Sequence, residues 1–160
     1  HLADPAVVVV IVGVATISLV RSRRPRLGLF LVTCTLGTAV LTTAAKLTVD
    51  RVRPPRELWL SVASGPAFPS GHSAQAVACY GALAVVGCAL LGRHSHRIGI
   101  IATALAVAVL VGGSRLYLGV HWLSDVIAGW AVASLWLFSL VLVGWAVPRL
   151  RRIHHSGHAS

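Results

Sequence analysis

The residues best suited to catalysis in this 160-residue chain are two histidines and one aspartate. His121 and Asp125 are four residues apart, so a helix that has already begun at this point places the carboxylate beside the imidazole. A carboxylate holds an imidazole in one tautomer and makes it a better nucleophile, while a second histidine, His72, can protonate a leaving oxygen. These three side chains predict nucleophilic catalysis assisted by a general acid.

Basic side chains and an expected helix start accompany these residues. Arg53 and Arg115 each present a planar fork that binds two phosphate oxygens, and Lys46 acts as a point charge. Ser70 and Gly71 lie where an apolar helix is expected to begin, and the free backbone N–H groups of a helix start favour an anion. A phosphoryl transition state spreads negative charge over its oxygens, so this set of donors favours phosphoryl transfer.

The composition indicates which elements position these residues. Hydrophobic residues make up 56% of the chain and charged residues only 11%, which lies outside the usual range of soluble domains. The net charge of +10 would suggest nucleic acid as the partner of a soluble protein, but the apolar background argues against it. We therefore expect an all-α, polytopic bundle of transmembrane helices with no nucleic-acid partner.

Five apolar runs free of Lys, Arg and Glu are the expected membrane spans. They cover Pro5–Val20, Leu27–Ala45, Ala74–Leu91, Ile98–Val111 and Leu123–Val147. The first and fourth runs are short for a span, and the fourth is expected to continue toward Arg115. We predict a single transmembrane catalytic domain, residues 1–147, followed by a basic, histidine-containing tail, residues 148–160.

The connectors between these spans differ in charge. Connectors 21–26 and 92–97 together with the tail carry nine arginines, whereas connectors 46–73 and 112–122 carry five basic residues. Alternate connectors lie on opposite sides of a membrane, and the side richer in basic residues is usually cytoplasmic. We therefore expect a cytoplasmic C-terminus and a site that faces the extracytoplasmic side of the plasma membrane.

The order and spacing of these residues resemble the three-part signature of the type 2 phosphatidic acid phosphatase (PAP2) superfamily. Eleven positions match. They are Lys46, Arg53-Pro54, Pro69-Ser70-Gly71-His72, Ser114-Arg115, His121 and Asp125. The resemblance covers residues 46–125, about half of the chain, and implies a helical membrane phosphatase.

The resemblance also implies roles for the matched residues. His121 is implied to be the nucleophile that forms a phosphohistidine, Asp125 the residue that orients it, and His72 the general acid. The residues implied to hold the phosphoryl oxygens are Lys46, Arg53, Ser70, Gly71 and Arg115. No metal or other cofactor is implied, and the sequence shows no acid cluster suited to Mg²⁺. Arg51 and Arg56 match no signature position and are interpreted as contacts to lipid head groups.

The predicted activity is hydrolysis of a phosphomonoester or pyrophosphate on a lipid whose tail stays in the bilayer. Candidate substrates are polyprenyl pyrophosphate, phosphatidylglycerol phosphate, phosphatidic acid and a polyprenyl-phosphoryl phosphosugar of bacterial cell-wall building. Two alternatives stay open: a lipid phosphotransferase, and a non-catalytic protein that binds or flips lipid phosphates. The family's membrane members usually have six helices, so a further helix before His1 also stays open, as does the oligomeric state.

Overall fold

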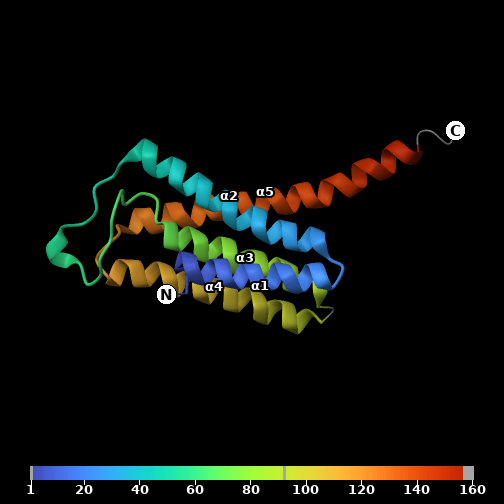
Figure 1. Ribbon diagram of the computed structural model, residues 1–160, viewed down its shortest axis with the longest axis horizontal. Helices are drawn as coiled ribbons and strands as arrows, with labels where there is room; N and C mark the ends of the chain where they lie inside the picture. Colours follow the sequence, from blue (N-terminus) through green and yellow to red (C-terminus); the bar gives the residue numbers. More distant parts are fainter. Residues whose placement is uncertain (1, 92, 157–160) are drawn as a thin grey trace.

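The long apolar runs form helices, which satisfy their own backbone polar groups where no water is present. The computed structural model describes residues 2–91 and 93–156, with side-chain surroundings as far as Gly144. Within these residues lie five α-helices (Figure 1). They are α1 (Pro5–Arg21), α2 (Pro25–Val49), α3 (Gly71–Leu90), α4 (His94–Tyr117) and α5 (Leu123–Ser156). A short 3₁₀ turn, η1 (Arg56–Leu58), lies between α2 and α3. The predicted all-α class is confirmed.

Four of the helices are long and apolar enough to cross a membrane. They are α2, α3, α4 and the Leu123–Gly144 part of α5. The fourth run does continue past Arg115, because α4 ends at Tyr117. α1 has 17 residues, at the lower end of the range for a span. α5 continues to Ser156, so the helix extends into the predicted tail, of which residues 157–160 lie outside the described part of the chain.

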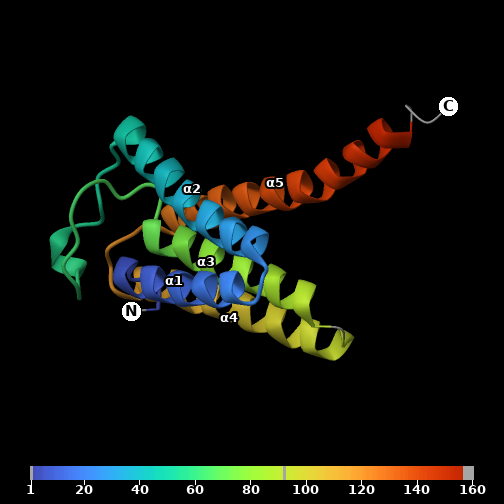
Figure 2. The same ribbon diagram turned by 45° about the vertical axis from the view of Figure 1, so that its right-hand side comes forward.

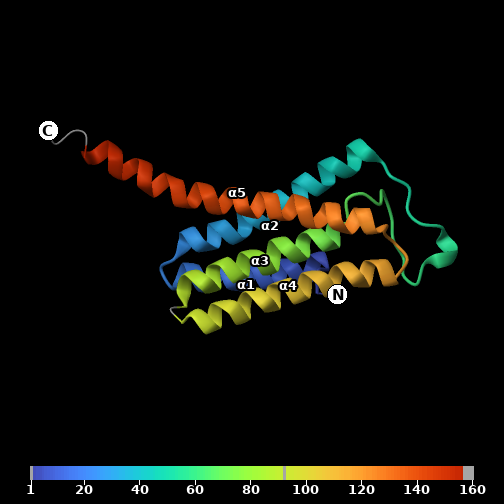
Figure 3. The same ribbon diagram turned by 180° about the vertical axis from the view of Figure 1, so that it is seen from behind.

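The connectors alternate between the two ends of the bundle. Figures 1 and 3 show the α2–α3 and α4–α5 connectors at one end, and the α1–α2 and α3–α4 connectors at the other. We call the first the connector end and the second the opposite end. The C-terminal part of α5 extends beyond the bundle at the opposite end. The two segments that carry the predicted chemistry therefore share one end of the molecule, as the alternation of spans predicts.

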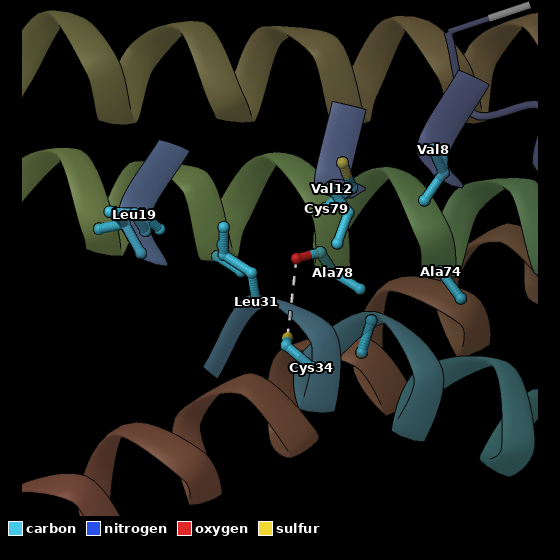
Figure 4. Close-up of a cluster of buried hydrophobic side chains, with 11 residues drawn as sticks. Val8, Val12, Leu19, Leu31, Cys34, Ala74, Ala78 and Cys79 are labelled. Carbon is cyan, nitrogen blue, oxygen red and sulfur yellow. Dashed lines mark hydrogen bonds between the residues drawn. The ribbon is translucent and has the colours of Figure 1, made fainter. Parts of the chain in front are cut away.

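α3 lies at the centre of the bundle and contacts all four other helices. Its sequence is rich in alanine and glycine, which allow helix backbones to approach closely. Figure 4 shows Ala74, Ala78 and Cys79 of α3 packed with residues of α1 and α2. The Cys34 thiol of α2 lies 3.6 Å from the Ala78 carbonyl oxygen, to which it donates. α3 is thus a narrow central helix around which the others are arranged.

The outward surface of the bundle is apolar. Many large hydrophobic side chains on the outer faces are more than half exposed, among them Val10, Leu29, Leu105, Leu110 and Leu135. Apolar exposure of this extent is unfavourable in water and suits contact with lipid tails. At the connector end α2 diverges from α1 (Figure 2), and this separation positions the site described next.

Candidate active site

The site is built where the start of α3 meets the start of α5. The backbone N–H of Ser70 donates to the carbonyl oxygen of Asp125 at 2.9 Å. Gly129, one helical turn after Asp125, faces the same segment, and a Cβ added to it would lie 2.6 Å from the Ser70 carbonyl oxygen. Glycine at this position therefore permits the close approach of the two helix starts. That approach links the segment carrying His72 to the segment carrying His121.

Ser70 is the N-cap of α3. Its side chain is fully buried, and its hydroxyl accepts hydrogen bonds from the Ser73 N–H at 3.5 Å and the Ser73 hydroxyl at 2.9 Å. The capping serine is not among the residues that line the neighbouring cavity, whereas Gly71 and His72 are. The first turn of α3, where backbone N–H groups lack helical acceptors, therefore lies at the cavity.

A cavity of about 590 Å³ lies between α1 and α2 and extends to the start of α3. Its polar end is lined by Lys46, Arg53, Gly71, His72 and His121. Most of its other wall is apolar and comes from α1 and α2, with Val8, Val9, Val12, Val32, Leu36 and Ala39 among its residues. One cavity thus joins a cationic, histidine-bearing end to an apolar end, which suits an amphipathic ligand.

Backbone carbonyl groups hold the two cations of the polar end. The Lys46 ammonium donates to the Pro66 carbonyl oxygen at 2.6 Å. The Arg53 guanidinium donates to the carbonyl oxygens of Ser64, Gly65 and Val120 at 2.9, 3.0 and 2.8 Å. Neutral carbonyl groups fix the positions of these charges without cancelling them. The two cations are therefore organised in advance and remain able to attract an anion.

His121 lies between a cation and a carboxylate. Its Nε2 is 3.3 Å from Nη1 of Arg53, and its Nδ1 is 3.4 Å from Oδ2 of Asp125. The second separation is long for a hydrogen bond, so Asp125 acts on the ring chiefly through its charge. A guanidinium can only donate, so its position at Nε2 favours the tautomer whose proton is on Nδ1, facing Asp125. In this tautomer Nε2 is unprotonated, and its lone pair faces the Arg53 guanidinium.

The surroundings of His121 also favour its neutral form. The side chain is almost fully buried. Burial and the nearby Arg53 cation lower the pKa of His121, and the Asp125 carboxylate opposes this shift. Burial lowers the pKa of Arg53 as well, but a guanidinium titrates so far above neutral pH that it stays charged. The pair therefore presents a neutral imidazole beside a fixed positive charge.

Asp125 is fully buried, and both of its oxygens are held. Oδ1 accepts from Nη1 of Arg51 at 2.9 Å, and Oδ2 accepts from the backbone N–H of Trp122 at 2.8 Å. Arg51, interpreted from the sequence as a contact to lipid head groups, is instead paired with this carboxylate. The two residues are 74 positions apart, and no spacing in the sequence connects them. The only sequence feature that could have indicated a role for Arg51 at the site is its position two residues before Arg53.

Arg115 is positioned differently from the other predicted cations. It lies half-buried in the last turn of α4, where its Nε donates to the Ser114 hydroxyl at 3.3 Å. It is not among the residues that line the cavity. The chain then turns toward His121 at Gly119, whose φ of +68° is a left-handed conformation in which an added Cβ would collide with the Leu58 carbonyl group.

The histidine, cysteine and acidic side chains of the described residues do not form a metal-binding cluster. Within the described residues there is no group of three or more His, Cys, Asp or Glu side chains that could hold a metal ion. The donors that converge on the polar end of the cavity are cations, backbone N–H groups and imidazoles. Such donors are suited to bind an anion rather than a cation.

A sequence model of the PAP2 superfamily matches residues 27–149, well over half of the chain, and this range contains every predicted site residue. The chain belongs to the PAP2 superfamily. The resemblance inferred from eleven matched positions is thereby confirmed, while the roles of the individual residues stay predictions.

Two curated relatives of this PAP2 protein are phosphatases by name. Phosphatidylglycerophosphatase B of Bacillus subtilis (strain 168) is 42% identical over 96 residues, which are 58% of this chain and 45% of that protein. Undecaprenyl-diphosphatase of Sulfolobus acidocaldarius is 32% identical over 128 residues, which are 77% of this chain and 58% of that protein. The chain thus spans about half the length of the curated relatives that it matches.

A solved structure has the same fold. It is the crystal structure of a transmembrane PAP2-type phosphatidylglycerolphosphate phosphatase from Bacillus subtilis, with a TM-score of 0.85 and 29% sequence identity. The similarity covers 92% of this chain and 73% of that one. Together with four helices long and apolar enough to span a bilayer, it shows that this PAP2 protein is an integral membrane protein.

Proposed function

We propose that this PAP2 protein is a lipid phosphatase that hydrolyses a phosphomonoester or pyrophosphate carried by a membrane lipid. The observation that carries the proposal is the single cavity whose polar end holds two histidines and two cations and whose other wall is apolar. A lipid phosphate has the same division into an anionic head and a hydrocarbon tail. The names of the two curated relatives support the same class of reaction.

In the proposed mechanism the bound phosphoryl group takes over the hydrogen bond that Arg53 Nη1 makes to Nε2 of His121, and the lone pair on Nε2 then attacks phosphorus. An N–P bond forms while the bond from phosphorus to the leaving oxygen breaks, and His72 donates a proton to that oxygen. Asp125 stabilises the positive charge that develops on the ring of His121. In the second step His72 accepts a proton from water, the water oxygen bonds to phosphorus, the N–P bond to His121 breaks, and inorganic phosphate leaves. Both histidines then return to their starting states.

The transferred phosphoryl group is held by the cations and the helix start. Lys46 and Arg53 bind its oxygens from the α2 side, and the first-turn N–H groups of α3 at Gly71 bind them from the other. Arg115 is proposed as a third cation for the head group. Ser70 contributes by capping α3, which fixes the direction of these N–H groups. Because these donors are fixed before the substrate arrives, little reorganisation opposes the reaction.

The site is proposed to face the extracytoplasmic side of the plasma membrane, with the C-terminus in the cytoplasm. This follows from the nine arginines of the opposite end against five basic residues at the connector end. The tail of the substrate then lies along the apolar α1–α2 wall, within the depth of the bilayer. Phosphatidylglycerol phosphate and a polyprenyl pyrophosphate are the two substrates that the relatives' names favour.

The first test is phosphate release by the detergent-purified protein in EDTA. The panel is phosphatidylglycerol phosphate, polyprenyl pyrophosphate, phosphatidic acid and a polyprenyl-phosphoryl phosphosugar. We expect release from one class of lipid, loss of release in His121→Ala, and full release in His94→Ala, a matched exposed histidine at the opposite end.

Three results would contradict this proposal. The first is a folded protein that releases phosphate from none of these lipids, which would favour a binding or flipping role. The second is transfer of the phosphoryl group to an acceptor lipid without release, which would identify a phosphotransferase. The third is loss of activity in EDTA that Mg²⁺ restores, which would show a metal requirement.

A further inference from the structure

The connector between α2 and α3 contributes one cation that belongs to no signature position, Arg51. Its Nη1 lies 2.9 Å from Oδ1 of Asp125 and 2.6 Å from the Ser124 hydroxyl, to which it also donates. Its guanidinium carbon is 5.8 Å from the centre of the Trp122 ring, within the range of a cation–π contact. All three partners belong to the segment that follows His121.

We propose that Arg51 is a positioning residue of the phosphatase, which acts through Asp125 to hold the ring of His121 for attack. This inference rests on the function proposed above and adds to it a residue outside the family signature. Arg51 does not line the cavity, so it is not a substrate ligand in this arrangement.

Asp125 needs such a partner because it carries a charge in a fully buried place. An ionised carboxylate is costly to bury unless it is paired and hydrogen-bonded. Arg51 holds Oδ1 and the Trp122 N–H holds Oδ2, so the carboxylate cannot rotate away from the imidazole. Geometry at a catalytic site is maintained by locked neighbours of this kind.

Arg51 is itself fixed by the contacts between the two connectors. Its carbonyl oxygen accepts from the Ala67 N–H at 2.8 Å. The next residue, Val52, accepts from the indole N–H of Trp122 at 3.1 Å. The Arg51 side chain is 36% exposed, so solvent reaches one side of the guanidinium while the other side faces Asp125. The arginine therefore ties the α2–α3 connector to the start of α5.

The pairing also has an electrostatic consequence for His121. The charged and titratable groups that contact it or share its cavity are Lys46 of α2, Arg53 of the following connector, His72 of α3 and Asp125 of α5. Arg51 reduces the negative field that Asp125 exerts on the imidazole. Removal of Arg51 should therefore favour protonated His121 and move the acid limb of the kcat/KM profile to higher pH.

The test compares Arg51→Gln and Arg51→Lys with Arg56→Gln, a matched control. Arg56 lies in the same connector, 5.7 Å from the ring centre of Trp59, and is exposed. Because Arg51 and Asp125 are directly coupled, we expect Arg51→Gln to lower kcat by about tenfold to a hundredfold with little change in KM. The acid limb should also move to higher pH in this variant. Lysine keeps the charge but not the fork, so we expect about a threefold loss in Arg51→Lys.

A double-mutant cycle with Asp125→Asn separates action through Asp125 from any other role. If Arg51 acts through the carboxylate, Arg51→Gln should lower kcat by no more than about twofold once Asp125 is already replaced. Losses that multiply in the double variant would overturn the proposal. So would a rise in KM at unchanged kcat, which indicates a head-group contact.

A misfolded variant, a failure of the proposed function and a failure of this inference give different results. If Arg51→Gln does not elute as a single folded species, Arg51→Lys decides the question, and wild-type kcat and pH profile in that variant would overturn the proposal. An inactive wild-type protein would instead contradict the proposed function. An active wild type with unaffected Arg51 variants would contradict this inference alone.

Discussion

The two ends of the bundle contain the same kinds of residue in different surroundings. The opposite end carries most of the arginines, and as far as Gly144 its histidines and arginines, among them Arg21, Arg93 and His94, are exposed. At the connector end His121 is almost fully buried, and the cations Lys46 and Arg53 are anchored on backbone carbonyl groups. Residue type is therefore a poor guide to which end does chemistry, and burial and anchoring are better ones.

The physical reason lies in what water does to a charge. An exposed arginine is hydrated and mobile, and salt screens its field over about 10 Å. A cation fixed by carbonyl groups at the edge of an apolar cavity acts in a lower dielectric. Its side chain loses little conformational entropy when it binds an anion. The opposite end is thus suited to set the orientation in the membrane, and the connector end to bind and transform a phosphate.

Replacement of one histidine at each end should give the largest difference in activity between the two ends. We expect His121→Ala to lower kcat at least about 10³-fold, because loss of a nucleophile leaves only the contribution of binding and electrostatics. His94→Ala should retain the wild-type rate. The measurement is steady-state phosphate release at saturating lipid. Comparable losses in both variants would show that the two ends do not differ in their contribution to catalysis.

The cations provide the next largest contrast. Arg53 contacts His121, so we expect Arg53→Ala to lower kcat by about 10²–10³-fold, the usual effect of removing one organised donor. The kcat of Arg53→Lys should lie between those of the wild type and Arg53→Ala, because an ammonium lacks the planar fork. Arg93→Ala, at the opposite end, should leave kcat unchanged. Equal rates in Arg53→Lys and wild type would argue that Arg53 acts as a point charge only.

Much of this contrast could be predicted from the sequence. Alternating spans placed the two motif-bearing connectors at one end, and motif spacing selected His72, His121, Lys46 and Arg53, which do line one cavity. The sequence could not show that the Ser70 hydroxyl would be used as a helix cap, because that depends on how α3 begins.

The contacts of the α2–α3 connector were beyond sequence reasoning. This segment has no periodic pattern, and its path is set by hydrogen bonds to residues far along the chain, such as the one from Arg53 to the Val120 carbonyl. The Arg51–Asp125 pair follows from such contacts. Spacing predicts residues on one helix well and residues on a loop poorly.

A packing change at the connector end should destabilise that end without altering its charges. Gly129→Ala puts a Cβ against the Ser70 carbonyl oxygen, so we expect a loss of about 1–3 kcal/mol in stability and a lower kcat. Gly144→Ala is the matched control on the same helix, since a Cβ there meets nothing within 4 Å. Thermal unfolding in detergent measures both variants. An unchanged midpoint in Gly129→Ala would contradict the close approach of α3 and α5.

The smallest expected effect concerns pH. His121 must be neutral to attack, and burial together with Arg53 lowers its pKa, so the neutral form persists as pH falls through the ordinary range of histidine, about 6.5. The acid limb of kcat/KM should therefore lie below that range, and the alkaline limb should report loss of the His72 proton, giving a bell-shaped profile. Arg53→Gln removes a cation that disfavours protonation, so in that variant the acid limb should move to higher pH. A limb that stays in place would show that burial alone, and not the cation at the connector end, keeps the imidazole neutral.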